Sequence, residues 1–89
     1  DLLYVPSAFT PNGDGKNDLF NALGIVSDYT MEIFNRWGER VFRTNSLQSG
    51  WNGQYKGVLQ PNGIFVYLIR YKTSHNILKQ QTGTISLIR

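Results

Sequence analysis

The sequence contains no cysteine and a single histidine, His75. Without cysteine there can be no disulfide bonds, thiolate metal sites or cysteine nucleophiles. One histidine alone forms neither a catalytic triad nor a transition-metal site. The six carboxylates are dispersed apart from Asp14 and Asp18, and no glycine-rich phosphate loop precedes a helix. We therefore expect a protein that is not an enzyme.

Charged residues are also few and scattered. Nine lysines and arginines stand against six aspartates and glutamates, and the basic residues form no run. Nucleic-acid binding usually needs a clustered basic face, so we expect no nucleic-acid partner. No apolar stretch approaches the roughly 20 residues of a membrane-spanning helix, so we expect no direct membrane insertion. The 89 residues are enough for one small domain.

Helical periodicity is nearly absent, whereas short alternating patterns typical of strands recur. The segment 64–71 is apolar on both faces, which predicts a central strand covered on both sides. Glycine turns separate the segments, and this spacing predicts a sandwich or barrel. The expected strands lie near residues 2–5, 19–25, 29–34, 40–44, 64–71, 77–81 and 84–89.

The stretch TPNGDGKND permits two interpretations. Asn12, Asp14 and Asp18 supply oxygen donors at close spacing, a glycine follows Asp14, and Lys16 offers a backbone carbonyl, as in calcium loops. No glutamate provides a bidentate contact, however, and the charge of Lys16 opposes a cation. The alternative is a pair of glycine turns in which aspartate and asparagine cap backbone N–H groups.

The stretch IFNRWGERVF predicts a hairpin, because two strand patterns flank a short polar turn. Gly38 can adopt the positive φ that such a turn needs. Trp37 either folds back onto the core or stands out as a contact residue, since tryptophan is a favoured interface anchor. Trp51 and Tyr55, farther along, either form an aromatic platform for a sugar ring or cap one end of the core.

Three blocks occur in a fixed order: FTPNGDGKNDLF, IFNRWGERVF and, at the end, GTISLIR, with WNGQYKGVLQPNGIFVYLIRY between the last two. Together they resemble the gliding-motility-associated C-terminal domain, also called the type B sorting domain of the type IX secretion system. The resemblance covers nearly all of the chain. It departs from the family at Asn52, where aspartate is more frequent, and at Phe65, where tyrosine is usual.

This resemblance implies an all-β fold, an immunoglobulin-like β-sandwich of about seven short antiparallel strands. It implies that residues 1–89 are a single C-terminal sorting domain at the end of a larger exported protein, often an adhesin. The precursor would cross the inner membrane by an N-terminal signal. The domain would then be read by the type IX translocon and a dedicated outer-membrane β-barrel protein, for a location at the cell surface or outside the cell.

We expect partner contacts at the hairpin tip and at the C-terminal strand, whose edge could accept a partner strand. The alternative function is a free-standing adhesive module that binds glycan or protein through Trp37, Trp51 and Tyr55. No cofactor is required, and calcium at the loop formed by Asn12, Asp14, Lys16 and Asp18 is the one ion that the pattern admits. The residues expected to bind the partner are Arg36, Trp37, Gly38, Leu87, Ile88 and Arg89.

Overall fold

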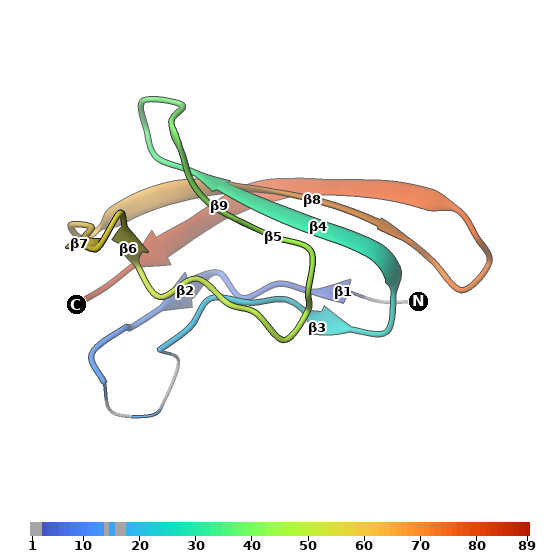
Figure 1. Cartoon of the computed structure of the whole chain (residues 1–89), viewed down its shortest axis with the longest axis horizontal. Coiled ribbons are helices and arrows are strands. Elements are labelled where there is room, and N and C mark those ends of the chain that lie inside the picture. The colour runs from blue at the N-terminus through green and yellow to red at the C-terminus, as the bar shows by residue number, and fades with distance from the viewer. Residues whose placement is uncertain (1–2, 14, 16–17) are drawn as a thin grey trace.

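The computed structural model describes residues 3–13, 15 and 18–89, and over these residues it contains strands and loops but no helix (Figure 1). No helix that could span a membrane is therefore found in this part of the chain. The all-β class is confirmed. The strands are β1 (Leu3–Tyr4), β2 (Ala8–Phe9), β3 (Leu23–Gly24), β4 (Ser27–Phe34), β5 (Arg40–Thr44), β6 (Gln54–Tyr55), β7 (Val58–Leu59), β8 (Gly63–Lys72) and β9 (Leu78–Leu87).

A five-stranded sheet with the order β2-β9-β8-β4-β5 forms the larger layer. Its neighbours are antiparallel except for β2 and β9, which run parallel. β8 lies in the middle, as its apolar sequence predicts. β9 pairs with β8 without interruption from Leu78 to Leu87, so the separate strands predicted at 77–81 and 84–89 are wrong and form one strand. Gly83 continues the ladder opposite Tyr67 instead of ending it.

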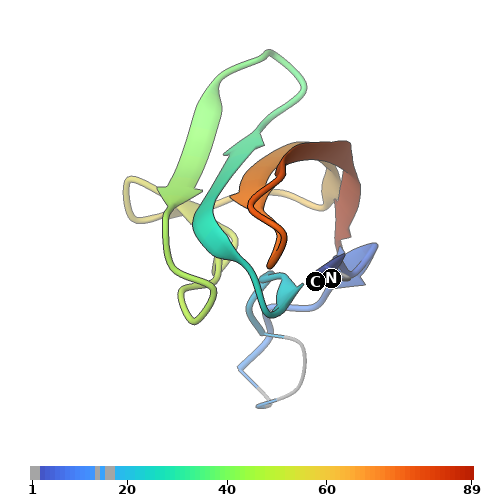
Figure 2. The ribbon, with the colours of Figure 1, turned by 90° about the vertical axis from the view of Figure 1, so that its right-hand side faces the viewer.

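The second layer is built from very short pieces of strand. β1 pairs with β3, β6 pairs with β7, and an isolated bridge joins Phe20 to Trp51. The strand predicted at 19–25 is thus reduced to β3 and this bridge. Figures 1 and 2 show these pieces on one side of the five-stranded sheet. Because they supply only a few residues, they cover only one face of the sheet.

Aromatic side chains join the two layers. Trp51 from the second layer is fully buried, and its ring lies 4.9 Å from that of Phe65 on β8. Phe20 lies 6.0 Å from the ring of Tyr67, also on β8, and Phe9 contacts both second-layer rings. Rings of this size supply much of the burial energy of a small core. The remaining core residues include Tyr29, Met31, Ile33, Ile69, Tyr71, Ile85 and Leu87.

The opposite face of the sheet is open to solvent. Ile64 and Val66 on β8 are 54% and 42% exposed, while the residues between and after them are buried. The expectation that both faces of this strand are covered is therefore wrong. The described residues form no third layer over this face, and β4 and β9 contribute half-exposed or exposed side chains to it.

Tyr29 places a polar hydroxyl group in the core. Its hydroxyl is buried, and although the backbone of Ala22 lies close to it, the two groups do not reach the geometry of a hydrogen bond. Burial raises the pKa of this hydroxyl to about 12, and the nearby backbone of Ala22 only partly offsets the shift. The pKa of Tyr29 is thus higher in the folded state than in the unfolded state. The contribution of the protonated hydroxyl to the free energy of unfolding is therefore fully present below about pH 10 and is lost as the pH rises toward about 12.

We expect Tyr29→Phe to be neutral or to stabilise the domain by up to about 1 kcal/mol at pH 7, because it removes a buried polar group without a partner. Between about pH 10 and pH 12 the wild type should lose on the order of 2 kcal/mol more than the variant. Urea unfolding at both pH values measures the difference. Parallel pH profiles for the two proteins would contradict this account of Tyr29.

Candidate recognition groove

The β4–β5 hairpin is shaped by Asn35. Its side-chain Oδ1 accepts hydrogen bonds from the backbone N–H groups of Trp37 and Glu39, each at 3.0 Å. Its backbone closes the turn by bonding to Glu39 and Gly38. Gly38 has a φ of 80°, which a glycine adopts without strain. The tip is thus a turn closed by hydrogen bonds among its own residues.

Trp37 stands out from this tip. The side chain is 82% exposed, so the interpretation in which it folds back onto the core is wrong. Asn35 accepts the N–H groups of the turn, and the indole ring of Trp37 projects into solvent. Trp37 is therefore accessible to a partner, and tryptophan is enriched among interface anchors.

Trp51 and Tyr55 do not form the aromatic platform considered from the sequence. Trp51 is fully buried, and its ring N–H donates to the carbonyl of Gln54 at 2.8 Å. Tyr55 is half-buried, and its hydroxyl bonds to the carboxylate of Glu39 at 3.2 Å. The two rings therefore have structural roles: one fills the core, and the other ties β6 to the base of the hairpin.

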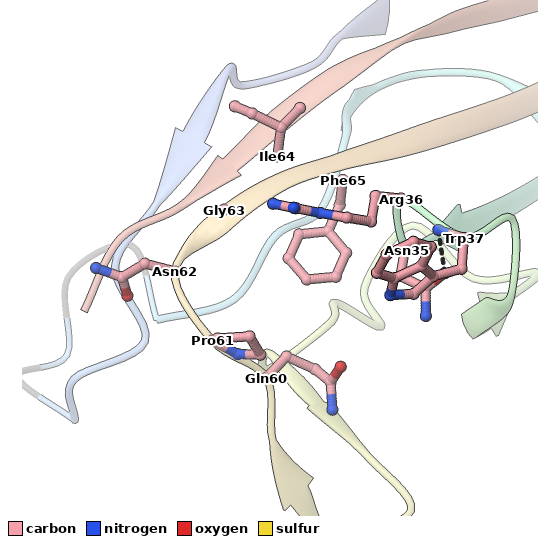
Figure 3. A pocket seen from close by; sticks show the side chains of 9 residues that line it. All are labelled: Asn35, Arg36, Trp37, Gln60, Pro61, Asn62, Gly63, Ile64 and Phe65. Carbon is pink, nitrogen blue, oxygen red and sulfur yellow. Dashed lines mark hydrogen bonds between the residues drawn. The ribbon is translucent and has the colours of Figure 1, made fainter.

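A groove of about 470 Å³ lies between the hairpin tip and the segment that leads into β8 (Figure 3). Arg36 extends its side chain along β8, and its Nη2 lies 3.9 Å from the point where a Cβ on Gly63 would be. The groove is lined by Asn35, Arg36, Trp37, Gln60, Pro61, Asn62, Gly63, Ile64 and Phe65.

The groove carries the positive charge of Arg36, which makes no ion pair with the described residues. The ion pairs in the described part of the chain are Arg40 with Glu32, at 2.9 Å, and Lys72 with Asp28, at 3.4 Å. Arg36 takes part in neither. With an exposed indole beside it and Ile64 on the floor, the groove combines a cation with apolar surface. This combination fits a ligand that carries both a carboxylate and an apolar group.

The C-terminal residues lie behind one wall of this groove. Leu87 is only 1% exposed and belongs to the core, so its side chain presents no surface to a partner. Ile88 is 47% exposed. Arg89 donates from Nε to the carbonyl of Gln60 at 2.8 Å, and its backbone N–H bonds to Asn62 at 2.9 Å.

Arg89 also ties together two further loops. Its Nη2 donates to the carbonyl of Gly53 at 3.0 Å, and its Nη1 to that of Pro11 at 3.4 Å. The two segments predicted to bind a partner, the hairpin tip and the chain end, therefore meet at the segment from Gln60 to Gly63. This segment was not among the contact regions predicted from the sequence. Its Pro-Asn-Gly turn was visible, but nothing local indicated that it forms the opposite wall of a groove.

Within the loop considered for calcium, Asp14 and Lys16 lie outside the described residues. Asp18 uses one carboxylate oxygen to accept the backbone N–H groups of Asn12 and Gly13, at 3.2 and 3.0 Å, and the other to accept that of Gly15, at 2.8 Å. Asp18 thus caps backbone N–H groups, as expected if the loop is a pair of glycine turns. Over the described residues, no three carboxylates, histidines or cysteines gather at a metal site. Calcium binding stays a prediction.

Comparisons with known proteins point in one direction. The family model of the CHU_C type IX secretion signal domain matches residues 3–87. No curated protein is significantly similar in sequence. Among solved structures, the chain is similar to PorZ, an essential bacterial surface component of the type-IX secretion system of Porphyromonas gingivalis. The TM-score is 0.61 at 20% identity, and the match covers 99% of this chain but 11% of the PorZ chain, so it supports the fold alone.

Proposed function

Because the chain belongs to the CHU_C family of type IX secretion signal domains, we propose that it directs a larger, adhesin-like protein to the type IX translocon as a C-terminal sorting domain. The observation that carries this proposal is the family match over residues 3–87. Signal domains of this kind sort proteins and are not an enzyme family. A type IX signal also implies export to the cell surface or the surrounding medium.

In this proposal the precursor passes through the periplasm, and the folded domain is then recognised by a dedicated outer-membrane β-barrel protein. A folded sorting domain should present a rigid surface, because binding to a rigid surface costs less conformational entropy than binding to a flexible one. The groove meets this requirement: its tip is closed by Asn35 and its far wall is held by Arg89. We propose that Arg36 and Trp37 are the principal contacts.

Export of a reporter tests the proposal. A secreted fluorescent protein fused ahead of the domain would be produced in a bacterium with a type IX system. Arg36→Glu and Trp37→Ala should each reduce export by about ten-fold or more, as expected for interface anchors. Both side chains are exposed, so the melting temperature of the purified domain should change little.

Arg43→Glu is the matched control, since Arg43 is also an exposed arginine but lies on β5, away from the groove. It should leave export near the wild-type level. Equal losses in Arg36→Glu and Arg43→Glu would show that net charge matters and the groove does not. If both groove variants are fully exported while a reporter without the domain stays in the cell, the domain acts in sorting but the groove is not its recognition surface.

The alternative adhesive function now rests on Trp37 alone, because Trp51 is buried and Tyr55 is bonded to Glu39. A glycan array probed with the purified domain and with Trp37→Ala separates the two functions. Binding that disappears in the variant, together with normal export, would favour adhesion over sorting.

A further inference from the structure

One edge of the five-stranded sheet is largely uncovered. β9 pairs with β8 along its whole length, but on its other side β2 covers only Ser86 and Leu87. The segment Leu78–Thr84 therefore has a single strand neighbour in the described part of the chain (Figures 1 and 2). β1 does not cover the gap, since none of its Cα atoms lies within 8 Å of one in β9.

The direction of the backbone groups on this edge follows from the short pairing with β2. Ser86 and Ile88 donate their N–H groups across to Ser7 and Phe9. Successive residues of a strand direct their backbone groups to opposite sides. The even-numbered positions of β9 therefore face the uncovered side, and over the described residues the N–H and C=O groups of Leu78, Gln80, Thr82 and Thr84 pair with no second strand. All four side chains are exposed.

The edge is open because the chain leaves it early. Pairing with β9 begins only at Ala8, the first residue of β2. The preceding residues Leu3 and Tyr4 pair with β3 in the second layer instead. The sheet thus loses its outer strand where the β8–β9 hairpin extends beyond β2.

Natural sheets protect such edges with bulges, prolines or several charges. The other edge strand, β5, follows this rule: its pairing with β4 contains a register shift, and it carries Arg40 and Arg43. The open segment of β9 has fewer of these protections. Its ladder with β8 has no register shift and no proline, and Lys79 is its single charge. Such an edge is suited to accept another strand.

We propose that Leu78–Thr84 accepts an extended, acid-bearing segment of a partner protein, which adds a strand to the sheet. The charge of this region favours such a partner. Arg70, Lys72 and Lys79 are the cations of this half of the hairpin, and Asp28, paired with Lys72, is the one carboxylate bonded to them in the described residues. A second copy of the domain would instead bring like charges together.

The surface is distinct from the groove, which is formed by residues 35–37 and 60–65. The proposal therefore goes beyond the sorting function and does not depend on it. An incoming strand would place alternate side chains beside Thr82 and Thr84, next to the exposed row that includes Val66. β-Branched residues at those positions would fit this surface. Acidic residues would approach Arg70 and Lys72 farther along the same face, or Lys79 on the other face.

The test uses a phage library of random octapeptides, panned against the domain. We expect enrichment of sequences that alternate β-branched and acidic residues. Amide hydrogen exchange of the domain with a synthetic copy of the enriched peptide should then show protection at Leu78, Gln80, Thr82 and Thr84. The odd-numbered amides of β9 should not change, because they are already bonded to β8.

Thr82→Pro removes one outward N–H without disturbing the ladder to β8, and it should weaken peptide binding by about ten-fold. Thr82→Val retains the N–H and should bind like the wild type. Sedimentation of the free domain identifies the competing occupant: a dimer that Thr82→Pro dissociates would replace the proposed partner with a second copy. Failure to enrich any peptide, or binding that Thr82→Pro leaves intact, would also overturn the proposal.

Discussion

Replacing Gly83 with alanine should destabilise the domain by about 3 kcal/mol, at the upper end of the usual cost of overpacking. A Cβ at this position would lie 2.6 Å from the hydroxyl of Tyr67 and 2.8 Å from two of its ring carbons. The ring has little room to move, because it is buried and packs against Phe20 at 6.0 Å. Its hydroxyl also accepts a hydrogen bond from Gln81 at 3.3 Å. Urea unfolding of the variant gives the free-energy change.

A double-mutant cycle identifies the cause of the loss. In a Tyr67→Ala background the same Gly83→Ala change should cost less than about 1 kcal/mol, because the space above the glycine is empty. Thr82→Ala, at the neighbouring exposed position, serves as the control for altered strand propensity and should have a small effect. If Gly83→Ala costs the same with and without the Tyr67 ring, the contact between them is not the reason for the glycine.

Gly83 also shows why the strand boundaries could not be read from the sequence alone. A glycine between two apolar patterns usually marks a turn or a bulge, and the strands predicted from the sequence, 77–81 and 84–89, lie on either side of Gly83. Here the glycine lies inside a continuous ladder and makes room for an aromatic ring on the paired strand. The two situations look alike locally, because the difference depends on which residue of β8 lies opposite.

The alternating segments could be predicted because their pattern depends only on their own residues. β4, β5 and β8 each show their buried face in their own sequence, and the apolar character of residues 64–71 correctly predicts a central strand. What the pattern could not reveal is that one face stays open. That outcome depends on how much chain remains to build a third layer, which is a property of the whole domain.

The exposure of the two tryptophans likewise could not be predicted from the residues next to them. Trp37 is 82% exposed and Trp51 is fully buried, although both stand beside turn residues. Trp51 is buried because Phe9 and Phe65, distant in sequence, converge on it. The sequence predicted the hairpin tip and the chain end as separate contact regions. Their meeting at the segment from Gln60 to Gly63 depends on hydrogen bonds that only the folded chain shows.

Removing the entire end of β9 would not test recognition by the chain end. The segment 83–89 contains Ile85 and Leu87, both in the core, and its loss would unfold the sheet. Failure of export would then follow from instability. Arg89 permits a sharper experiment, because its side chain lies outside the core and acts on the wall of the groove.

Arg89→Ala should destabilise the domain by about 2 kcal/mol, since it removes charge-assisted hydrogen bonds to carbonyls in three loops but at a largely exposed site. The bonds that are lost run to Gln60, Gly53 and Pro11. Without them the segment from Gln60 to Asn62 should move more freely. Amide hydrogen exchange should therefore accelerate there and at Gly53, while the centre of the β8–β9 ladder keeps its protection.

Arg89→Lys is the informative control because it retains the charge but not the planar fork of donors. A single ammonium group on a shorter chain cannot reach three carbonyls at once. We therefore expect the lysine variant to recover less than half of the lost stability and to leave exchange at Gln60 fast. Full recovery by lysine would show that charge near the loop carbonyls is sufficient. If exchange at Gln60 is slow in both variants, Arg89 does not hold the wall of the groove, and the effect of the chain end on recognition must be sought at Ile88.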